Sequence, residues 1–94
     1  MNLSDAIGSY TDWSTPWTFW ESVRSKLDPH SEDAKLFEAL LLEAARFEHW
    51  KIGDLALGSK IARTATKLKF PEVNDQVIGS IVRAASYDWK LNAA

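Results

Sequence analysis

Apolar residues recur along most of the chain three and four positions apart, which is the spacing of one face of an α-helix. The pattern is interrupted by glycine and proline, at Gly8, Pro16, Pro29, Gly53 and Pro71. No Asn-Gly or Asp-Gly pair stands between alternating β-branched residues, so nothing in the pattern indicates a β-hairpin. The sequence therefore predicts an all-α fold.

Four of the five predicted helices begin at a residue suited to that position. Ser4, Ser31 and Asp54 can accept hydrogen bonds from first-turn backbone N–H groups, and Pro16, after two hydroxyl residues, suits the first helical position. The expected helices span residues 4–10, 16–27, 32–52, 55–69 and 73–89. Short connections favour antiparallel neighbours. We expect one domain over residues 1–94, a compact bundle of four main helices plus a short N-terminal helix, arranged in antiparallel helical hairpins.

The same pattern identifies the expected core. The 32–52 helix is apolar on nearly every side from Leu36 to Leu42, which is typical of a central helix. The predicted buried face of the 55–69 helix follows the spacing i, i+4, i+8 and i+11 and consists of Leu57, Ile61, Ala65 and Leu68. The predicted buried residues of the last helix are Val77, Ile78, Ile81, Val82 and Ala85.

Composition narrows the protein class. A chain of 94 residues holds one core, and its five Trp, four Phe and two Tyr supply large side chains to fill it. There is no Cys, which excludes disulfides and thiolate chemistry and suits a reducing compartment, so we expect a cytoplasmic protein. The N-terminus does not resemble a signal peptide, and no apolar run approaches the roughly 18 residues of a membrane span.

Charge is unevenly distributed along the chain. The net charge is −2, but residues 1–50 carry four basic and nine acidic side chains whereas residues 51–94 carry seven basic and four acidic. Such an asymmetry either steers a charged partner toward one end or lets the two halves attract each other.

No pattern typical of catalysis is present. His30 and His49 lack the spacing of metal ligands, and the sequence contains no Gly-x-Ser-x-Gly elbow and no glycine-rich phosphate loop. Glu43, Glu48 and His49 could form a carboxylate site with a partner chain, but solvated charges on a helix surface are the commoner arrangement. We therefore expect a protein that is not an enzyme, with no catalytic residues, no cofactor and no metal.

Three tryptophans form the first candidate binding feature. Trp13, Trp17 and Trp20 are spaced i, i+4 and i+7 and share one face if a helix or its entry turn runs through them. Two interpretations stay open: the tryptophans pack in the core, or they stay exposed as anchors for a partner, because Trp is enriched at binding hot spots. With Phe19 and Val23 nearby, this helix has more apolar surface than a small core covers, which favours a partner or a homo-oligomer.

Three basic residues form the second candidate feature. Lys60, Arg63 and Lys67 are spaced i, i+3 and i+7 on one face of the 55–69 helix. A basic face can follow DNA phosphates, but the last helix adds only Arg83 and Lys90, so nucleic acid is the less favoured partner. A solvated face or an acidic protein partner fits better.

The sequence thus predicts a small protein–protein interaction module, such as an adaptor, regulator or inhibitor, including a virus-encoded or immunity-type blocker. The expected partner is another protein or a second copy of the chain, and not a membrane. The Trp13, Trp17 and Trp20 face is expected to anchor it, and Lys60, Arg63 and Lys67 to steer it. Two alternatives remain: a small apolar ligand held between tryptophan-lined helices, and a DNA-binding regulator that uses the basic stripe.

Overall fold

The computed structural model describes residues 2–92. Within them the chain is helical throughout its regular structure and forms no strand, which confirms the all-α prediction. The elements are α1 (Leu3–Gly8), the 3-10 helix η1 (Pro16–Thr18), α2 (Phe19–Lys26), α3 (Glu32–Ala44), α4 (Phe47–Trp50), α5 (Leu55–Lys69) and α6 (Asp75–Asn92). No helix in this range is both long and apolar enough to cross a membrane.

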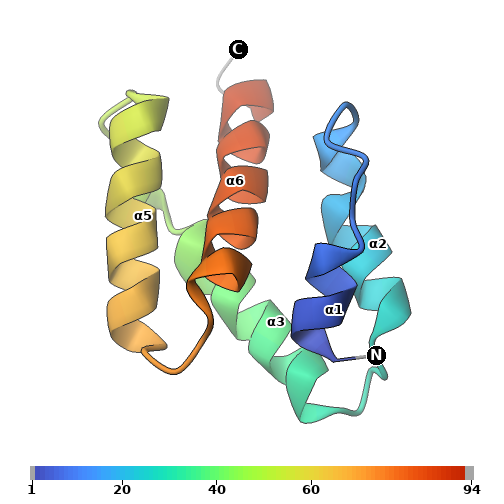
Figure 1. The fold of residues 1–94 in the computed structure, drawn as a ribbon. Helices are drawn as coiled ribbons and strands as arrows, with labels where there is room; N and C mark the ends of the chain where they lie inside the picture. The colour runs from blue at the N-terminus through green and yellow to red at the C-terminus, as the bar shows by residue number, and fades with distance from the viewer. Residues whose placement is uncertain (1, 93–94) are drawn as a thin grey trace.

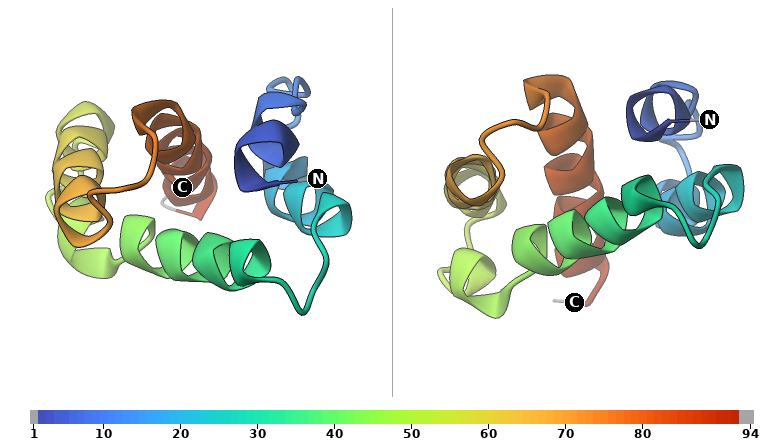
Figure 2. Two further views of the ribbon diagram at one scale, coloured as in Figure 1. Left: turned by 60° about the horizontal axis from the view of Figure 1, so that its bottom comes forward. Right: turned by 90° about the horizontal axis from the view of Figure 1, so that it is seen from below.

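The helices pack around α6. Figure 1 shows α6 between α5 on one side and the α1 and α2 segment on the other, and α3 crosses beneath them in the left view of Figure 2. α5 and α6 run in opposite directions and form an antiparallel hairpin of the expected kind (Figure 1). α3 contacts α1, α5 and α6, so it has the central position predicted for it.

Two of the predicted caps are confirmed and one is wrong. The Ser31 hydroxyl accepts a hydrogen bond from Ala34 N (3.1 Å), and the Asp54 carboxylate accepts one from Leu57 N (3.1 Å). At the N-terminus the side chain of Asn2, and not Ser4, caps α1. Asn is as good an N-cap as Ser, so the cap can lie at Asn2, two residues before the predicted position. The helix ends at Gly8 instead of residue 10.

The predicted 32–52 helix is divided into α3 and α4 in the structure. Arg46 between them has extended backbone angles, φ −60° and ψ 135°. The break allows the indole N–H of Trp50 to donate a 2.8 Å hydrogen bond to the carbonyl oxygen of Ala44, one of the last carbonyls of α3. Gly53, which follows α4, has φ 81°, the left-handed conformation that glycine commonly adopts after the end of a helix.

Of the other three predicted helices, 55–69 has the predicted bounds (α5), and the remaining two differ only near their ends. The 16–27 helix begins with η1 and ends at Lys26. The last helix begins at Asp75 instead of 73, because the side chain of Asn74 accepts a hydrogen bond from Gln76 N (2.7 Å), and it continues to Asn92 instead of 89.

The core follows the prediction in α6 but not in α5. All five residues predicted to be buried in α6 are buried, together with Phe19 of α2 and Phe37 and Leu40 of α3. In α5 the prediction of a buried Leu57, Ile61 and Leu68 is wrong, since these side chains are 40%, 38% and 79% exposed. The residues of α5 that are buried are small: Gly58, Ala62 and Thr66. They face inward because α5 lies so close to its neighbours that a larger side chain does not fit there, as Gly58 against Trp50 shows.

Candidate binding surface

Two of the three tryptophans pack within the fold. Trp13 contacts Tyr10 edge-on (4.9 Å between ring centroids) and stacks on Phe19 (5.4 Å). Trp20 contacts Phe19 (4.8 Å), and its indole N–H donates a 2.6 Å hydrogen bond to Asp88, which ties α2 to α6. Both side chains are half-buried, so their main role is to cover the core.

Trp17 is the tryptophan that remains exposed. It lies in η1 and is 57% exposed. Trp13 precedes η1 in a turn, and the Arg83 guanidinium lies over its ring at 4.1 Å from the centroid. The structure therefore does not bring Trp13, Trp17 and Trp20 together on one open face of a helix.

The predicted basic stripe lies on the surface of α5. Lys60 and Arg63 are exposed, and neither forms an ion pair with any residue in the described range 2–92. Lys67 is engaged within the protein: its ammonium group donates a 2.6 Å hydrogen bond to the carbonyl oxygen of Val73 and pairs with Asp75 at 2.9 Å. The stripe thus offers two unpaired cations to a partner.

An apolar stripe runs beside these cations. Leu57, Ile61, Thr64 and Leu68 are spaced i, i+4, i+7 and i+11, which places them on one line along the helix. Together with Lys60 and Ala65 they line a shallow groove of about 410 Å³. Leucine and isoleucine side chains of this exposure leave a continuous apolar strip in contact with water.

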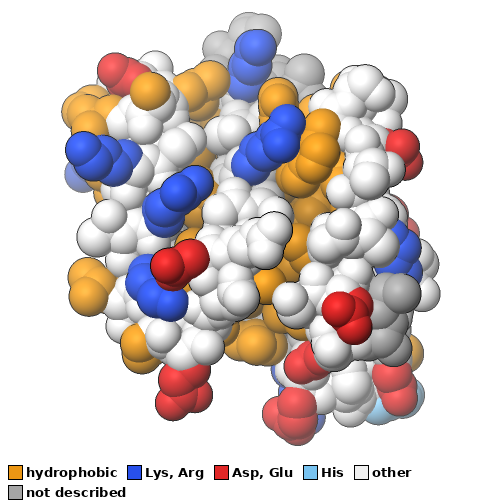
Figure 3. Space-filling model, in the orientation of Figure 1, with side chains coloured by type: hydrophobic (Ala, Val, Ile, Leu, Met, Phe, Trp, Pro, Cys, Tyr) orange, Lys and Arg blue, Asp and Glu red, His pale blue; other side chains and the backbone are white. Residues whose placement is uncertain are grey.

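A second depression continues this surface toward α6. It has a volume of about 360 Å³, is lined by Arg63, Lys67, Asp75 and Ile78, and shares Thr64 and Leu68 with the groove. In Figure 3 basic side chains gather over α5 and the neighbouring part of α6, with apolar side chains along the edge of α5. We call this surface the α5 outer face and define it by Leu57, Lys60, Ile61, Arg63, Thr64 and Leu68.

The predicted acidic group near the end of α3 is a structural joint. Glu43 is buried and accepts a 2.8 Å hydrogen bond from His49, and its carboxylate also lies 3.3 Å from Lys69 and 3.6 Å from Arg46. Burial raises the pKa of Glu43, but the hydrogen bonds from His49 and Lys69 and the charge of Arg46 outweigh it, so that pKa lies below the ordinary value for Glu. The cluster joins α3, α4 and α5.

Glu48 does not belong to this joint, since it pairs with Arg46 at 3.3 Å on the surface. Within residues 2–92 no three His, Cys, Asp or Glu side chains lie close enough together to hold a metal ion. The expectation of solvated surface charges is wrong for Glu43 and His49, because the break after α3 turns α4 so that His49 contacts Glu43 and both side chains are buried.

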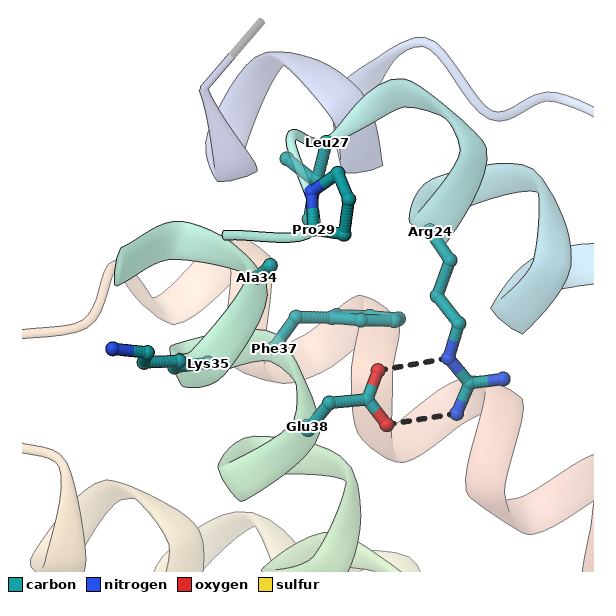
Figure 4. Close-up of a pocket in the computed structure, with 7 residues that line it drawn as sticks. All are labelled: Arg24, Leu27, Pro29, Ala34, Lys35, Phe37 and Glu38. Carbon is teal, nitrogen blue, oxygen red and sulfur yellow. Dashed lines mark hydrogen bonds and ion pairs between the residues drawn. The ribbon is translucent and has the colours of Figure 1, made fainter. Parts of the chain in front are cut away.

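Two other clefts bear on the alternative of a small ligand. The first, shown in Figure 4, has a volume of about 230 Å³, and its lining includes Phe37, Leu27 and Pro29. Its Arg24 already makes two hydrogen bonds of 2.8 and 2.9 Å to Glu38, and Lys35 points away from the other labelled side chains (Figure 4). This volume is below the roughly 300–1,000 Å³ of typical ligand pockets.

The second cleft, of about 550 Å³, is open and mostly apolar, between the start of α1, α3 and the turn from α5 to α6. Its lining includes Leu36, Phe70 and Val77. Neither cleft has a tryptophan in its lining, so neither corresponds to the tryptophan-lined site that the sequence suggested.

The apolar residues of the α5 outer face, Leu57, Ile61 and Leu68, were predicted from the sequence to be buried in the core, but they are exposed. The opposite face of α5 carries a second line of regularly spaced residues, Gly58, Ala62 and Thr66, which are small and uncharged, and the spacing alone does not select between the two lines. A helix that must approach its neighbours closely places such residues inward, and its larger apolar side chains are then displaced to the outside.

The comparisons with known proteins add no further assignment: no protein-family model, no curated protein and no solved structure matches this chain.

Proposed function

We propose that this chain is a non-enzymatic protein–protein interaction module that binds a partner protein on the α5 outer face. The observation that carries the proposal is the exposed line of Leu57, Ile61 and Leu68 beside the unpaired cations Lys60 and Arg63. Exposed apolar residues scattered singly are normal, whereas an apolar patch with a polar rim is typical of an interaction site. The module would act as an adaptor, regulator or inhibitor by occupying a surface of its partner.

The energy available from the apolar line limits the strength of the complex. Burying what is exposed of these three side chains contributes about 3 kcal/mol, since full burial of one such side chain is worth about 1.5–3 kcal/mol. A micromolar complex requires about 8 kcal/mol. The apolar line therefore supplies only part of this energy. The adjacent cations add about 0.2–1 kcal/mol each as exposed ion pairs, and a micromolar complex needs further contacts beside them.

The tryptophans have a smaller part in this proposal than the sequence suggested. Trp17 is exposed and can contact a partner at a second place, while Trp13 and Trp20 stabilise the fold. A cysteine-free chain suits a reducing compartment, so we propose that binding occurs in the cytoplasm.

Photo-crosslinking in the source organism tests the proposal. A photoreactive phenylalanine analogue replaces Thr64, at the centre of the α5 outer face, and the adducts are identified by mass. Leu68→Asp is introduced as the disrupting change, and Leu42→Asp is its matched control, because Leu42 is 69% exposed on α3, close to the 79% of Leu68. Helix content measured by circular dichroism confirms that both variants fold.

We expect an adduct with a second protein that is lost with Leu68→Asp and kept with Leu42→Asp. The absence of an adduct, or an adduct that Leu68→Asp leaves unchanged, contradicts the proposal. An adduct whose mass is that of two copies of this chain assigns the surface to self-association and overturns the proposal that it binds a different protein.

A further inference from the structure

Building on the proposed function, we infer that the partner element bound by the α5 outer face is an acidic amphipathic helix. The inference rests on three features of this face: its length and shape, its charge, and the poor fit of a second copy of the chain.

The shape of the apolar line suits a helix. Leu57 to Leu68 covers eleven residue steps, or about 16 Å along α5. Helices pack by placing the side-chain ridges of one in the grooves of the other, so three turns of a partner helix can cover this line. The described part of the chain contains no strand whose edge an extended peptide could join. The partner's anchors would then be apolar residues spaced i, i+3 or i+4, and i+7.

The charge of α5 specifies an acidic partner. The helix contains Lys60, Arg63, Lys67 and Lys69 and no acidic residue. The one carboxylate that lines the two depressions, Asp75, is already paired with Lys67. A partner helix with glutamate or aspartate beside its apolar stripe can therefore pair with Lys60 and Arg63.

A second copy of this chain fits the face poorly. A two-fold contact between the outer faces of two α5 helices would bring Lys60 and Arg63 of both copies together, with no free carboxylate on either helix to compensate. Nucleic acid would use the cations but leave Leu57, Ile61 and Leu68 exposed to water. An acidic amphipathic helix can pair with the cations and also cover the apolar line.

Two designed peptides test the inference directly. Both are about 18 residues long, so that each can form a helix, and both carry the same leucine stripe. One has glutamate beside the stripe, and the other has lysine at the same positions. Binding of each labelled peptide is measured by fluorescence anisotropy, and the contact surface is mapped by NMR amide shifts.

We expect the glutamate peptide to bind about ten-fold more tightly than the lysine peptide, to weaken as salt is raised, and to shift α5 amides. The double variant Lys60→Glu/Arg63→Glu should reverse the preference between the peptides. Lys35→Glu, an exposed cation of α3 that lines neither depression, is the matched control and should leave the preference unchanged. Duplex DNA and vesicles of anionic lipid serve as competing probes.

Equal affinity for the two peptides, or shifts that leave α5 amides unchanged, would overturn the inference, as would tighter binding to DNA or to the vesicles than to the glutamate peptide. The crosslinking experiment separates this failure from failure of the proposed function. If the Thr64 adduct depends on Leu68 but not on Lys60 and Arg63, the interaction module stands and the acidic helix is rejected. If the adduct does not depend on Leu68, the proposed function is itself rejected.

Discussion

Gly58 lies against the indole ring of Trp50, where α5 meets α4. A Cβ atom at position 58 would stand 2.7 Å from Trp50 Cε3 and 3.1 Å from the carbonyl oxygen of His49. The ring has little freedom to move away, because its N–H is hydrogen-bonded to Ala44. This close approach turns the small residues of α5 inward, and it is the reason that Leu57, Ile61 and Leu68 form an exposed line on the outside.

Gly58→Ala is predicted to lower the free energy of unfolding by about 1–3 kcal/mol, because the clash outweighs the gain in helix propensity. Gly79→Ala is the matched control within α6. A Cβ there would meet only the Arg63 guanidinium, at an ordinary 3.5 Å, so this variant should be more stable than the wild type by about 0.5–1 kcal/mol. Urea denaturation measures both. Equal stability of the two variants would show that Trp50 is free to move.

Thr66→Val is predicted to stabilise the protein. The Thr66 hydroxyl is fully buried and has no hydrogen-bond partner within the described residues, so its lost hydration is not compensated. Valine has nearly the same shape, and removing the hydroxyl should raise the free energy of unfolding by about 1 kcal/mol. Thr64→Val, on the exposed side of α5, should change it by less than about 0.5 kcal/mol. A destabilised Thr66→Val variant would mean that the hydroxyl does find a partner.

Local signals in the sequence were sufficient for the helix starts that have a clear N-cap. Ser31 and Asp54 cap helices as predicted, because an N-cap depends only on the residue and the first turn that follows it. The buried face of α6 was also predictable, since its only regular line of large apolar residues is the buried one.

The face of α5 was not predictable from its own residues. Leu57, Ile61 and Leu68 and the smaller Gly58, Ala62 and Thr66 are both regularly spaced, and periodicity alone favours the larger side chains as core. The choice between the two lines is made by Trp50 and the break at Arg46, which bring α4 against α5. Such contacts depend on tertiary structure and leave no local pattern.

Only part of the candidate site was predicted, because the exposure of charged residues can be inferred from the sequence whereas the packing of the tryptophans depends on tertiary structure. Lys60 and Arg63 were identified correctly as surface cations, because charged side chains are rarely buried. The tryptophans were predicted to share one helical face. In the structure the segment before η1 is held in a non-helical turn by Tyr10, whose hydroxyl lies 2.9 and 3.0 Å from the carbonyl oxygens of Asp12 and Thr15. That fold takes Trp13 out of the helical register.

The structure predicts losses of stability of different size for two nearby tryptophans. Trp20→Ala removes aromatic contacts with Phe19 and the hydrogen bond to Asp88, and should cost about 3 kcal/mol or more. Trp17→Ala removes a mostly exposed side chain and should cost less than about 1 kcal/mol. Thermal unfolding followed by circular dichroism checks both variants. Similar losses for the two would show that Trp17 is packed in solution and is not available to a partner.

The buried carboxylate of Glu43 should make the stability of the protein depend on pH. Its pKa in the folded state lies below that of the unfolded chain, so the ionised group contributes stability at every pH above the ordinary Glu pKa of about 4.3. That contribution is lost as the pH falls from there through the folded-state pKa, because the carboxyl group is then protonated in both states.

Glu43→Gln removes this contribution and provides its measurement. At neutral pH the variant should be less stable than the wild type by about 1–3 kcal/mol, since hydrogen bonds to a charged group are lost from His49 and Lys69. Urea denaturation at a series of pH values should show this difference shrink as the pH falls below about 4.3. Glu32→Gln, which changes a largely exposed carboxylate paired loosely with Lys35, should show almost no difference at neutral pH. A Glu43→Gln difference that stays constant down to pH values where carboxylates are protonated would mean that it comes from packing and not from the charge.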